Sequence, residues 1–109
     1  MRKTEANVIN LTPHDIILFK DNEQILYKSA GVLRAECEYE LIGTVNGINV
    51  FKNKYISIDK MPKYKKGTYY IVSRIVAEIM KNRKDLLLVN ETVRNVKGQI
   101  IGCKSFSRL

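Results

Sequence analysis

Residues 68–89 read TYYIVSRIVAEIMKNRKDLLLV, and this pattern predicts a strand, a helix and a second strand in succession. Residues 68–72 are aromatic and β-branched, which favours a strand. A helix is expected over residues 74–83, because the apolar side chains there recur at helical spacing, and Ser73 is a suitable N-cap. Residues 86–89 then form a short apolar strand. We therefore predict a strand–helix–strand unit over residues 68–89.

Outside this unit, short runs of apolar and β-branched residues are separated by turn residues. The longest alternation covers residues 33–45, and the Asn46-Gly47 dipeptide after it is the strongest short signal for a tight hairpin. The other strand candidates cover residues 7–11, 16–20, 24–28, 48–51, 55–58 and 100–106. These patterns predict an α+β fold, in which a curved, mostly antiparallel sheet packs against one helix.

The length of 109 residues indicates a single domain over residues 1–109. Nineteen Lys and Arg against eleven Asp and Glu give a net charge of +8. This balance favours an anionic partner such as a nucleotide or a nucleic acid, although net charge also serves solubility alone.

The cysteines and the apolar segments bear on cellular location. Cys37 and Cys103 lack a CxxC partner, so we expect a reduced cytoplasmic protein with no metal and no cofactor, while a single disulfide stays open. No apolar run has the length of a signal peptide or a membrane span. We therefore expect no membrane partner.

Two groups of polar residues are candidates for binding an anion. Ser73 and Arg74 stand at the expected helix start, where a hydroxyl, backbone N–H groups and a guanidinium can hold a phosphate. Asn90 and Arg94 follow the strand at 86–89, and ligands commonly sit at the C-terminal ends of strands. The two groups share one edge if the strands are parallel neighbours. The alternative is a plain helix cap and a polar connection, because no glycine-rich phosphate loop is present.

The single histidine, His14, lies in Asn10-Leu11-Thr12-Pro13-His14, between two strand candidates. Histidine changes charge near neutral pH, so His14 can donate to a ligand or act as a general base. The alternative is a structural role in the turn. No serine or cysteine adjoins it in sequence, so the sequence favours a binding protein and leaves enzymatic activity open.

Residues 60–66 form the densest basic cluster of the chain. Lysines interleaved with an aromatic side chain are typical of surfaces that bind nucleic acid, and the alternative is a solvated loop. The candidate macromolecule-binding residues are Lys60, Lys63, Tyr64, Lys65 and Lys66.

Four segments resemble, as a set, a family of small proteins from bacteriophages, prophages and bacterial genomes. They are NLTPHDI (10–16), YYIVSRIVAE (69–78), RKDLLLV (83–89) and GQIIGCKSF (98–106). The family has no assigned activity, so the resemblance implies a phage context rather than a mechanism. Its recurrent polar positions correspond here to Asn10, Thr12, His14, Ser73 and Arg83.

Together, these features predict a non-catalytic phage accessory protein that sequesters a phosphate-bearing small molecule, for instance a nucleotide signal of bacterial defence. The step to anti-defence rests on analogy with other small phage proteins. A homo-oligomer is expected, because small domains commonly need a second copy to enclose a ligand. The alternative is an inhibitor that binds a host protein or nucleic acid through residues 60–66. The expected ligand-binding residues are Asn10, Thr12, His14, Ser73, Arg74, Arg83, Asn90 and Arg94.

Overall fold

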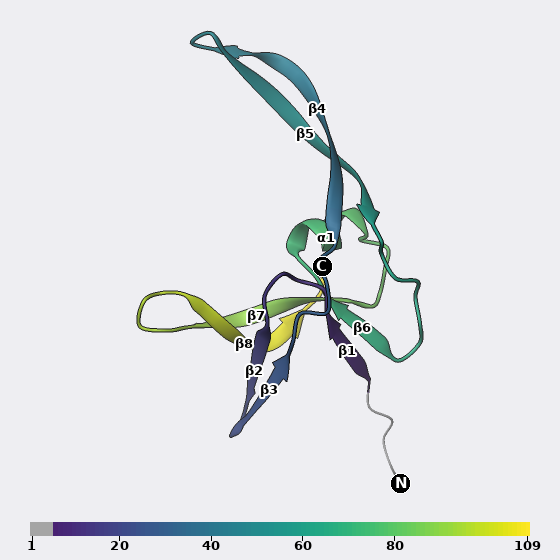
Figure 1. Cartoon of the computed structure of the whole chain (residues 1–109), viewed down its shortest axis with the longest axis vertical. Helices are drawn as coiled ribbons and strands as arrows, with labels where there is room; N and C mark the ends of the chain where they lie inside the picture. Colours follow the sequence, from purple (N-terminus) through teal and green to yellow (C-terminus); the bar gives the residue numbers. More distant parts are fainter. Residues whose placement is uncertain (1–5) are drawn as a thin grey trace.

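The computed structural model describes residues 6–109, which form eight strands and one short helix (Figure 1). Strands make up 56% of the structure and helix makes up 6%, so the protein is mostly β and the predicted α+β class is wrong. The elements are β1 (Asn7–Asn10), β2 (Ile16–Lys20), β3 (Glu23–Tyr27), β4 (Arg34–Val45), β5 (Ile48–Asp59), β6 (Thr68–Ile71), α1 (Arg74–Ile79), β7 (Leu86–Arg94) and β8 (Ile100–Ser107). No helix in this described part is long and apolar enough to cross a membrane.

Six strands form one curled sheet in the order β1-β6-β7-β8-β2-β3. The pairs β1/β6, β6/β7 and β2/β8 are parallel, whereas β7/β8 and β2/β3 are antiparallel. The sheet is therefore mixed, and the prediction of a mostly antiparallel sheet is wrong. The physical reason is that long crossovers, which local sequence patterns do not reveal, place strands from distant parts of the chain side by side.

The strand–helix–strand unit consists of β6, α1 and β7, and its two strands are parallel neighbours in register Tyr70↔Leu86 and Ile71↔Leu87. The Ser73 hydroxyl caps the helix, since it accepts the Val76 N–H at 3.4 Å. The helix ends at Ile79, four residues earlier than the predicted Arg83. It ends there because the chain turns toward β7, with the Arg83 N–H bonded to the Met80 carbonyl at 2.8 Å.

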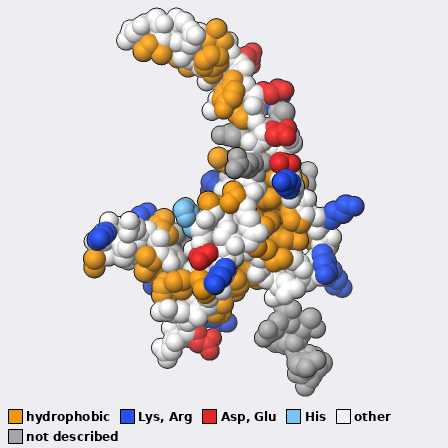
Figure 2. Space-filling model, in the orientation of Figure 1, with side chains coloured by type: hydrophobic (Ala, Val, Ile, Leu, Met, Phe, Trp, Pro, Cys, Tyr) orange, Lys and Arg blue, Asp and Glu red, His pale blue; other side chains and the backbone are white. Residues whose placement is uncertain are grey.

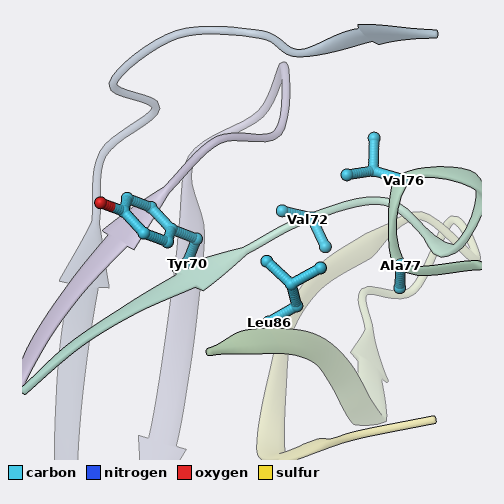
Figure 3. Packing of buried hydrophobic residues seen from close by; sticks show 5 residues of the cluster. All are labelled: Tyr70, Val72, Val76, Ala77 and Leu86. Carbon is cyan, nitrogen blue, oxygen red and sulfur yellow. The ribbon is translucent and has the colours of Figure 1, made fainter. Parts of the chain in front are cut away.

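Two apolar clusters cover the two faces of this sheet, because successive residues of a strand point to opposite faces. Tyr70, Val72 and Leu86 pack with Val76 and Ala77 of the helix segment (Figure 3). The second cluster joins residues of β2, β6 and β8, namely Ile16, Leu18, Ile71 and Cys103. We refer to the sheet and its helix as the body.

Within residues 6–109, the strands β4 and β5 pair only with each other, and they project from the body as a long hairpin, which we call the arm (Figure 1). The arm contributes to the elongated dimensions of 64 × 38 × 21 Å. Asn46 and Gly47 both have positive φ, 50° and 77°, which confirms the predicted turn. The sequence predicted a break between residues 51 and 55, but β5 is continuous there, because Lys52 and Lys54 pair across the hairpin with Glu40 and Glu38.

Candidate functional site

A pocket of about 520 Å³ opens in the body beside β6, β7 and β8. Its apolar lining includes Val72, Leu88, Val89, Ile100 and Ile101. Its polar lining includes Thr12, His14, Asp15, Ser73, Arg74, Asn90 and Ser107. A mostly apolar cavity with a few polar groups is the usual composition of a small-molecule site.

The parallel strands β1, β6 and β7 explain why these polar residues meet. Parallel strands end at the same edge of a sheet, so the segments that follow β1 and β6 emerge together. The segment after β1 supplies Thr12 and His14, and the segment after β6 supplies Ser73 and Arg74. Asn90 lies further along β7, on the same pocket wall. Five of the eight predicted ligand-binding residues therefore line one pocket.

Asn10 lies outside the pocket lining and holds the loop that carries Thr12 and His14. It is 1% exposed. Its amide nitrogen donates to the carbonyls of His14 (2.7 Å) and Tyr27 (2.9 Å). Its amide oxygen accepts the Thr12 N–H (2.9 Å) and the Thr12 hydroxyl (2.6 Å). This side chain has its polar groups engaged within the protein and acts on the pocket only by shaping the loop.

The same loop is fixed to the start of the arm connection by Ser29. The Ser29 hydroxyl donates to the Thr12 carbonyl at 2.5 Å, and the Ser29 N–H donates to the Asp15 carboxylate at 2.8 Å. Asp15 was not predicted as a site residue, and it lines the pocket with part of its charge engaged by this bond. The His14 backbone is thus held in place while its exposed side chain lines the pocket.

Arg74 supplies the positive charge of the pocket lining. Its guanidinium contacts Glu78 at 3.0 Å, and the two side chains are 73% and 55% exposed. An exposed pair of this kind contributes only about 0.2–1 kcal/mol, so a ligand anion can compete for the guanidinium at little cost. The hydroxyl of Ser73 accepts a long bond from the helix and keeps its own proton available for donation.

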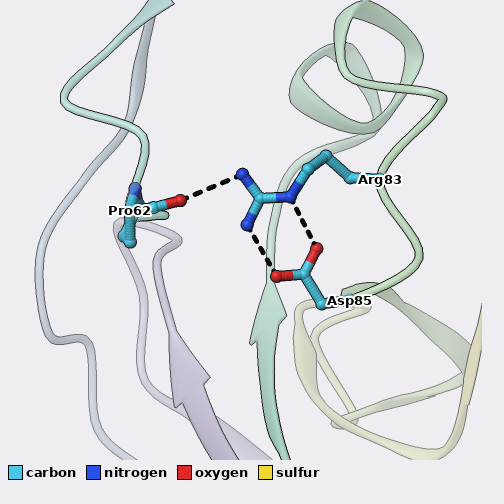
Figure 4. Close-up of polar contacts among 3 residues, drawn as sticks. All are labelled: Pro62, Arg83 and Asp85. Carbon is cyan, nitrogen blue, oxygen red and sulfur yellow. Dashed lines mark hydrogen bonds and ion pairs between the residues drawn. The ribbon is translucent and has the colours of Figure 1, made fainter. Parts of the chain in front are cut away.

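Arg83 lies away from the pocket lining and forms a buried ion pair with Asp85 (Figure 4). The two side chains share bonds of 2.8 and 2.6 Å, and Arg83 also donates to the Pro62 carbonyl at 2.9 Å. Asp85 is 1% exposed. Hydrogen bonds from Arg83 lower the pKa of Asp85, and those same bonds raise the pKa of Arg83. Arg83 therefore fixes the segment after β5 to the body. It also lines a second, smaller pocket of about 260 Å³, apart from the other predicted ligand-binding residues.

Arg94 is also separate from the pocket lining, because it lies at the end of β7. Its guanidinium donates to the Gly98 carbonyl at 2.6 Å within the β7–β8 hairpin. The Asn95 side chain bonds Lys97 and Gln99 in the same turn, at 2.9 and 3.0 Å. The sequence placed Arg94 near Ser73 because it follows a strand, but β7 runs on for several residues beyond the pocket.

The basic segment 60–66 lies on the surface between β5 and β6. Its candidate macromolecule-binding residues are all exposed, including Tyr64 at 62%. The segment is fixed at Pro62 by Arg83 and at Lys65 by the Thr68 N–H, which donates to the Lys65 carbonyl at 3.0 Å.

Strand β8 contributes to the pocket in a way that the sequence did not predict. Gly102 of β8 lines it and allows the close approach of β2, since a Cβ there would collide with the Ile17 carbonyl oxygen and the Phe19 ring. A glycine inside a strand pattern is a signal for such an approach. Cys103 beside it is buried and Cys37 is half-buried in the arm, and both are free thiols.

Searches against protein-family models, curated proteins and solved structures each find no match for this chain.

Proposed function

We propose that the pocket binds a small organic anion with an apolar or aromatic part, most simply a nucleotide, and holds it without turnover. The observation that carries this proposal is the convergence of Thr12, His14, Ser73, Arg74 and Asn90 on one mostly apolar pocket. The apolar lining suits a base or another ring, and Arg74 with the Ser73 hydroxyl and the Asn90 amide suits a phosphate. The net charge of +8 favours the approach of an anion.

Binding without turnover is supported by the way that nearby serines are used. Among the residues described, no hydrogen bond joins His14 to Ser73 or Ser107, the two serines of the pocket lining, and the Ser73 hydroxyl accepts a bond from the helix. A nucleophilic serine would instead be hydrogen-bonded to a base such as His14. The resemblance to phage proteins extends the proposal to a biological role, in which the protein sequesters a nucleotide signal of host defence in the host cytoplasm.

Isothermal titration calorimetry with a panel of linear and cyclic nucleotides tests this function. We expect one compound to bind, and Arg74→Ala to weaken its binding by about tenfold or more, because a bond to a charged group contributes about 1.5–3 kcal/mol. His14→Ala is expected to weaken binding as well. Arg94→Ala is the matched control, since it removes an exposed guanidinium outside the pocket lining.

Two results would overturn the proposal. The first is that no compound of the panel binds. The second is binding that Arg94→Ala weakens as much as Arg74→Ala does, because the interaction would then follow total charge rather than the pocket.

A second function rests on the exposed basic segment, and we propose it as the alternative. Its lysines and Tyr64 are exposed together, as a surface for nucleic acid or an acidic host protein requires. Steep weakening of DNA or RNA binding by salt would support it. Changing Lys63, Lys65 and Lys66 to alanine would then abolish binding, whereas Ser73→Ala would leave binding unchanged.

A further inference from the structure

The distal half of the arm carries a concentration of exposed apolar side chains (Figure 2). Each of six large side chains is between 51% and 69% exposed. They are Tyr39, Leu41, Ile42, Val45, Ile48 and Phe51. With about 100 Å² for each half-exposed large side chain, they present on the order of 600 Å² of apolar surface. This surface is divided between the two faces of the hairpin, because Phe51 and Ile48 are three residues apart on β5. Exposed apolar surface of about 300–600 Å² on a monomer commonly marks an interaction site.

Among the side chains that the structure describes, the contacts between arm and body lie at the base of the arm. Leu33, just before β4, and Ile58 of β5 pack against the cluster that contains Val76 and Leu86. Beyond this base, β4 and β5 have only each other as strand partners. An isolated two-stranded hairpin is at best marginally stable in water, so the distal arm needs a surface to cover it.

The net charges of the arm and of the rest of the chain indicate which kind of surface covers the distal arm. Residues 34–59 carry three Lys or Arg and four Asp or Glu, a net charge of −1, whereas the remaining residues carry sixteen and seven, a net charge of +9. A nucleic acid or an anionic membrane is attracted to the body and not to the arm. The arm instead matches a basic partner that also has exposed apolar side chains. The body of another copy is such a partner, with Val89, Ile100 and Ile101 exposed on it.

The area agrees with a reciprocal contact. In a symmetric dimer the arm of each copy docks on the body of the other, so each subunit buries apolar side chains of its own arm and the surface under its partner's arm. Two such contacts reach the roughly 800 Å² per partner that a stable interface buries. We propose that the distal arm docks on the body of a second copy of this chain. Val89, Ile100 and Ile101 also line the proposed ligand pocket, so the docked arm would lie over part of it, but the docking does not depend on a ligand.

Sedimentation velocity over a dilution series tests the docking. The protein is expected to sediment as a dimer or a larger oligomer. Leu41→Lys combined with Phe51→Lys changes a registered pair of the arm and is expected to give a folded monomer. Val96→Lys is the control, because Val96 is fully exposed at the tip of the other long hairpin. It should sediment as the wild type does. A monomeric wild type, or an oligomer that survives the double change, overturns the proposal.

A second pair keeps the test decisive if the first variant fails to fold. Val45→Lys with Ile48→Lys changes the residues that flank the Asn46-Gly47 turn, far from the packed base, and should also give a monomer. A photo-reactive amino acid at Ile48 locates the contact. Cross-links to residues of the body in another copy support the docking, whereas cross-links to arm residues alone, or none between copies, contradict it.

Discussion

The body and the arm follow equally regular strand patterns, yet they differ in what covers their apolar residues. In β6, Ile71 is fully buried and its neighbours Tyr70 and Val72 are buried on the other face. In β4, Tyr39 and Leu41 alternate just as regularly, but more than half of each is exposed. The difference shows that alternation predicts a strand and its sidedness, but does not tell whether the covering surface lies in the same chain.

The two regions also differ in how they are specified. Neighbouring residues specify the arm, since its turn is Asn46-Gly47 and its cross-strand pairs Glu38–Lys54 and Glu40–Lys52 have opposite charges. The body depends on contacts between distant segments, such as the bond from Asn10 to Tyr27 and the bond from Arg83 to Pro62. A change in the body should therefore cost folding free energy, whereas a change in the arm should alter association.

The largest effect on the free energy of unfolding is expected from Asp85→Ala, which removes the buried ion pair of the body. Removing one partner of such a pair leaves the other charge uncompensated and costs about 3–5 kcal/mol. That is a large part of the stability of a small domain, about 5–15 kcal/mol. Urea denaturation followed by circular dichroism measures the loss. A cost below about 1 kcal/mol would contradict the structural role assigned to Arg83 and Asp85.

The same pair gives a pH dependence. Because the folded state lowers the pKa of Asp85 from 3.8, its contribution to stability is complete above that value and is lost as the pH falls through the lowered pKa. Asp85→Asn removes this contribution, so its free energy of unfolding should fall less steeply in acid than that of the wild type. Equal acid sensitivity of the two proteins would contradict the assignment.

Matched truncations compare the body and the arm directly. Ile71→Ala removes a fully buried side chain and should cost about 2–5 kcal/mol of folding free energy. Leu41→Ala, measured in dilute monomeric protein, should cost less than about 0.5 kcal/mol, as surface substitutions usually do. Similar losses for the two variants would show that the arm is buried within its own chain.

Asn10→Ala should affect both the stability of the body and the binding of a ligand in the pocket. Each buried group that loses its hydrogen-bond partner costs about 1–3 kcal/mol, and the loop with Thr12 and His14 loses its support. Denaturation measures the stability, and calorimetry with the best-binding nucleotide should show weaker binding. Asn90→Ala is the control for stability, because Asn90 is exposed. Unchanged binding in folded Asn10→Ala would contradict the support role.

The smallest change is chemical and leaves the fold intact. Burial raises the pKa of the Cys103 thiol, and Cys103 is fully enclosed in the body. Cys37 is only partly buried in the arm. Iodoacetamide should therefore modify Cys37 well before Cys103, because the thiolate is the reactive form. Mass spectrometry of digested protein measures both rates, and faster modification of Cys103 than of Cys37 would contradict the burial of Cys103 in the body.

The sequence predicts local features of this protein well and long-range features poorly. The turn at Asn46-Gly47 and the cap at Ser73 follow from nearby residues, and both are observed. The predicted α+β class is wrong because the helix ends at Ile79 and long crossovers create the mixed sheet.

The same division applies to the candidate site. His14 and Ser73 line one pocket because each follows a strand of one parallel group. The sequence raised the parallel pairing of β6 and β7 as a condition for the site, but it did not predict that β1 lies beside β6. The sequence offered Arg94 as an anion ligand from its place after a strand, and Arg83 from the family resemblance. Their bonds to Asp85 and Gly98 become evident only in three dimensions.

Native mass spectrometry of the protein purified from bacteria, before and after denaturation, tests the division between arm and body most directly. We expect an oligomer whose subunits each carry a small phosphorylated compound, which denaturation releases. A ligand-free monomer would contradict both assignments. A ligand-free oligomer would count against the pocket alone, and a liganded monomer would count against the arm.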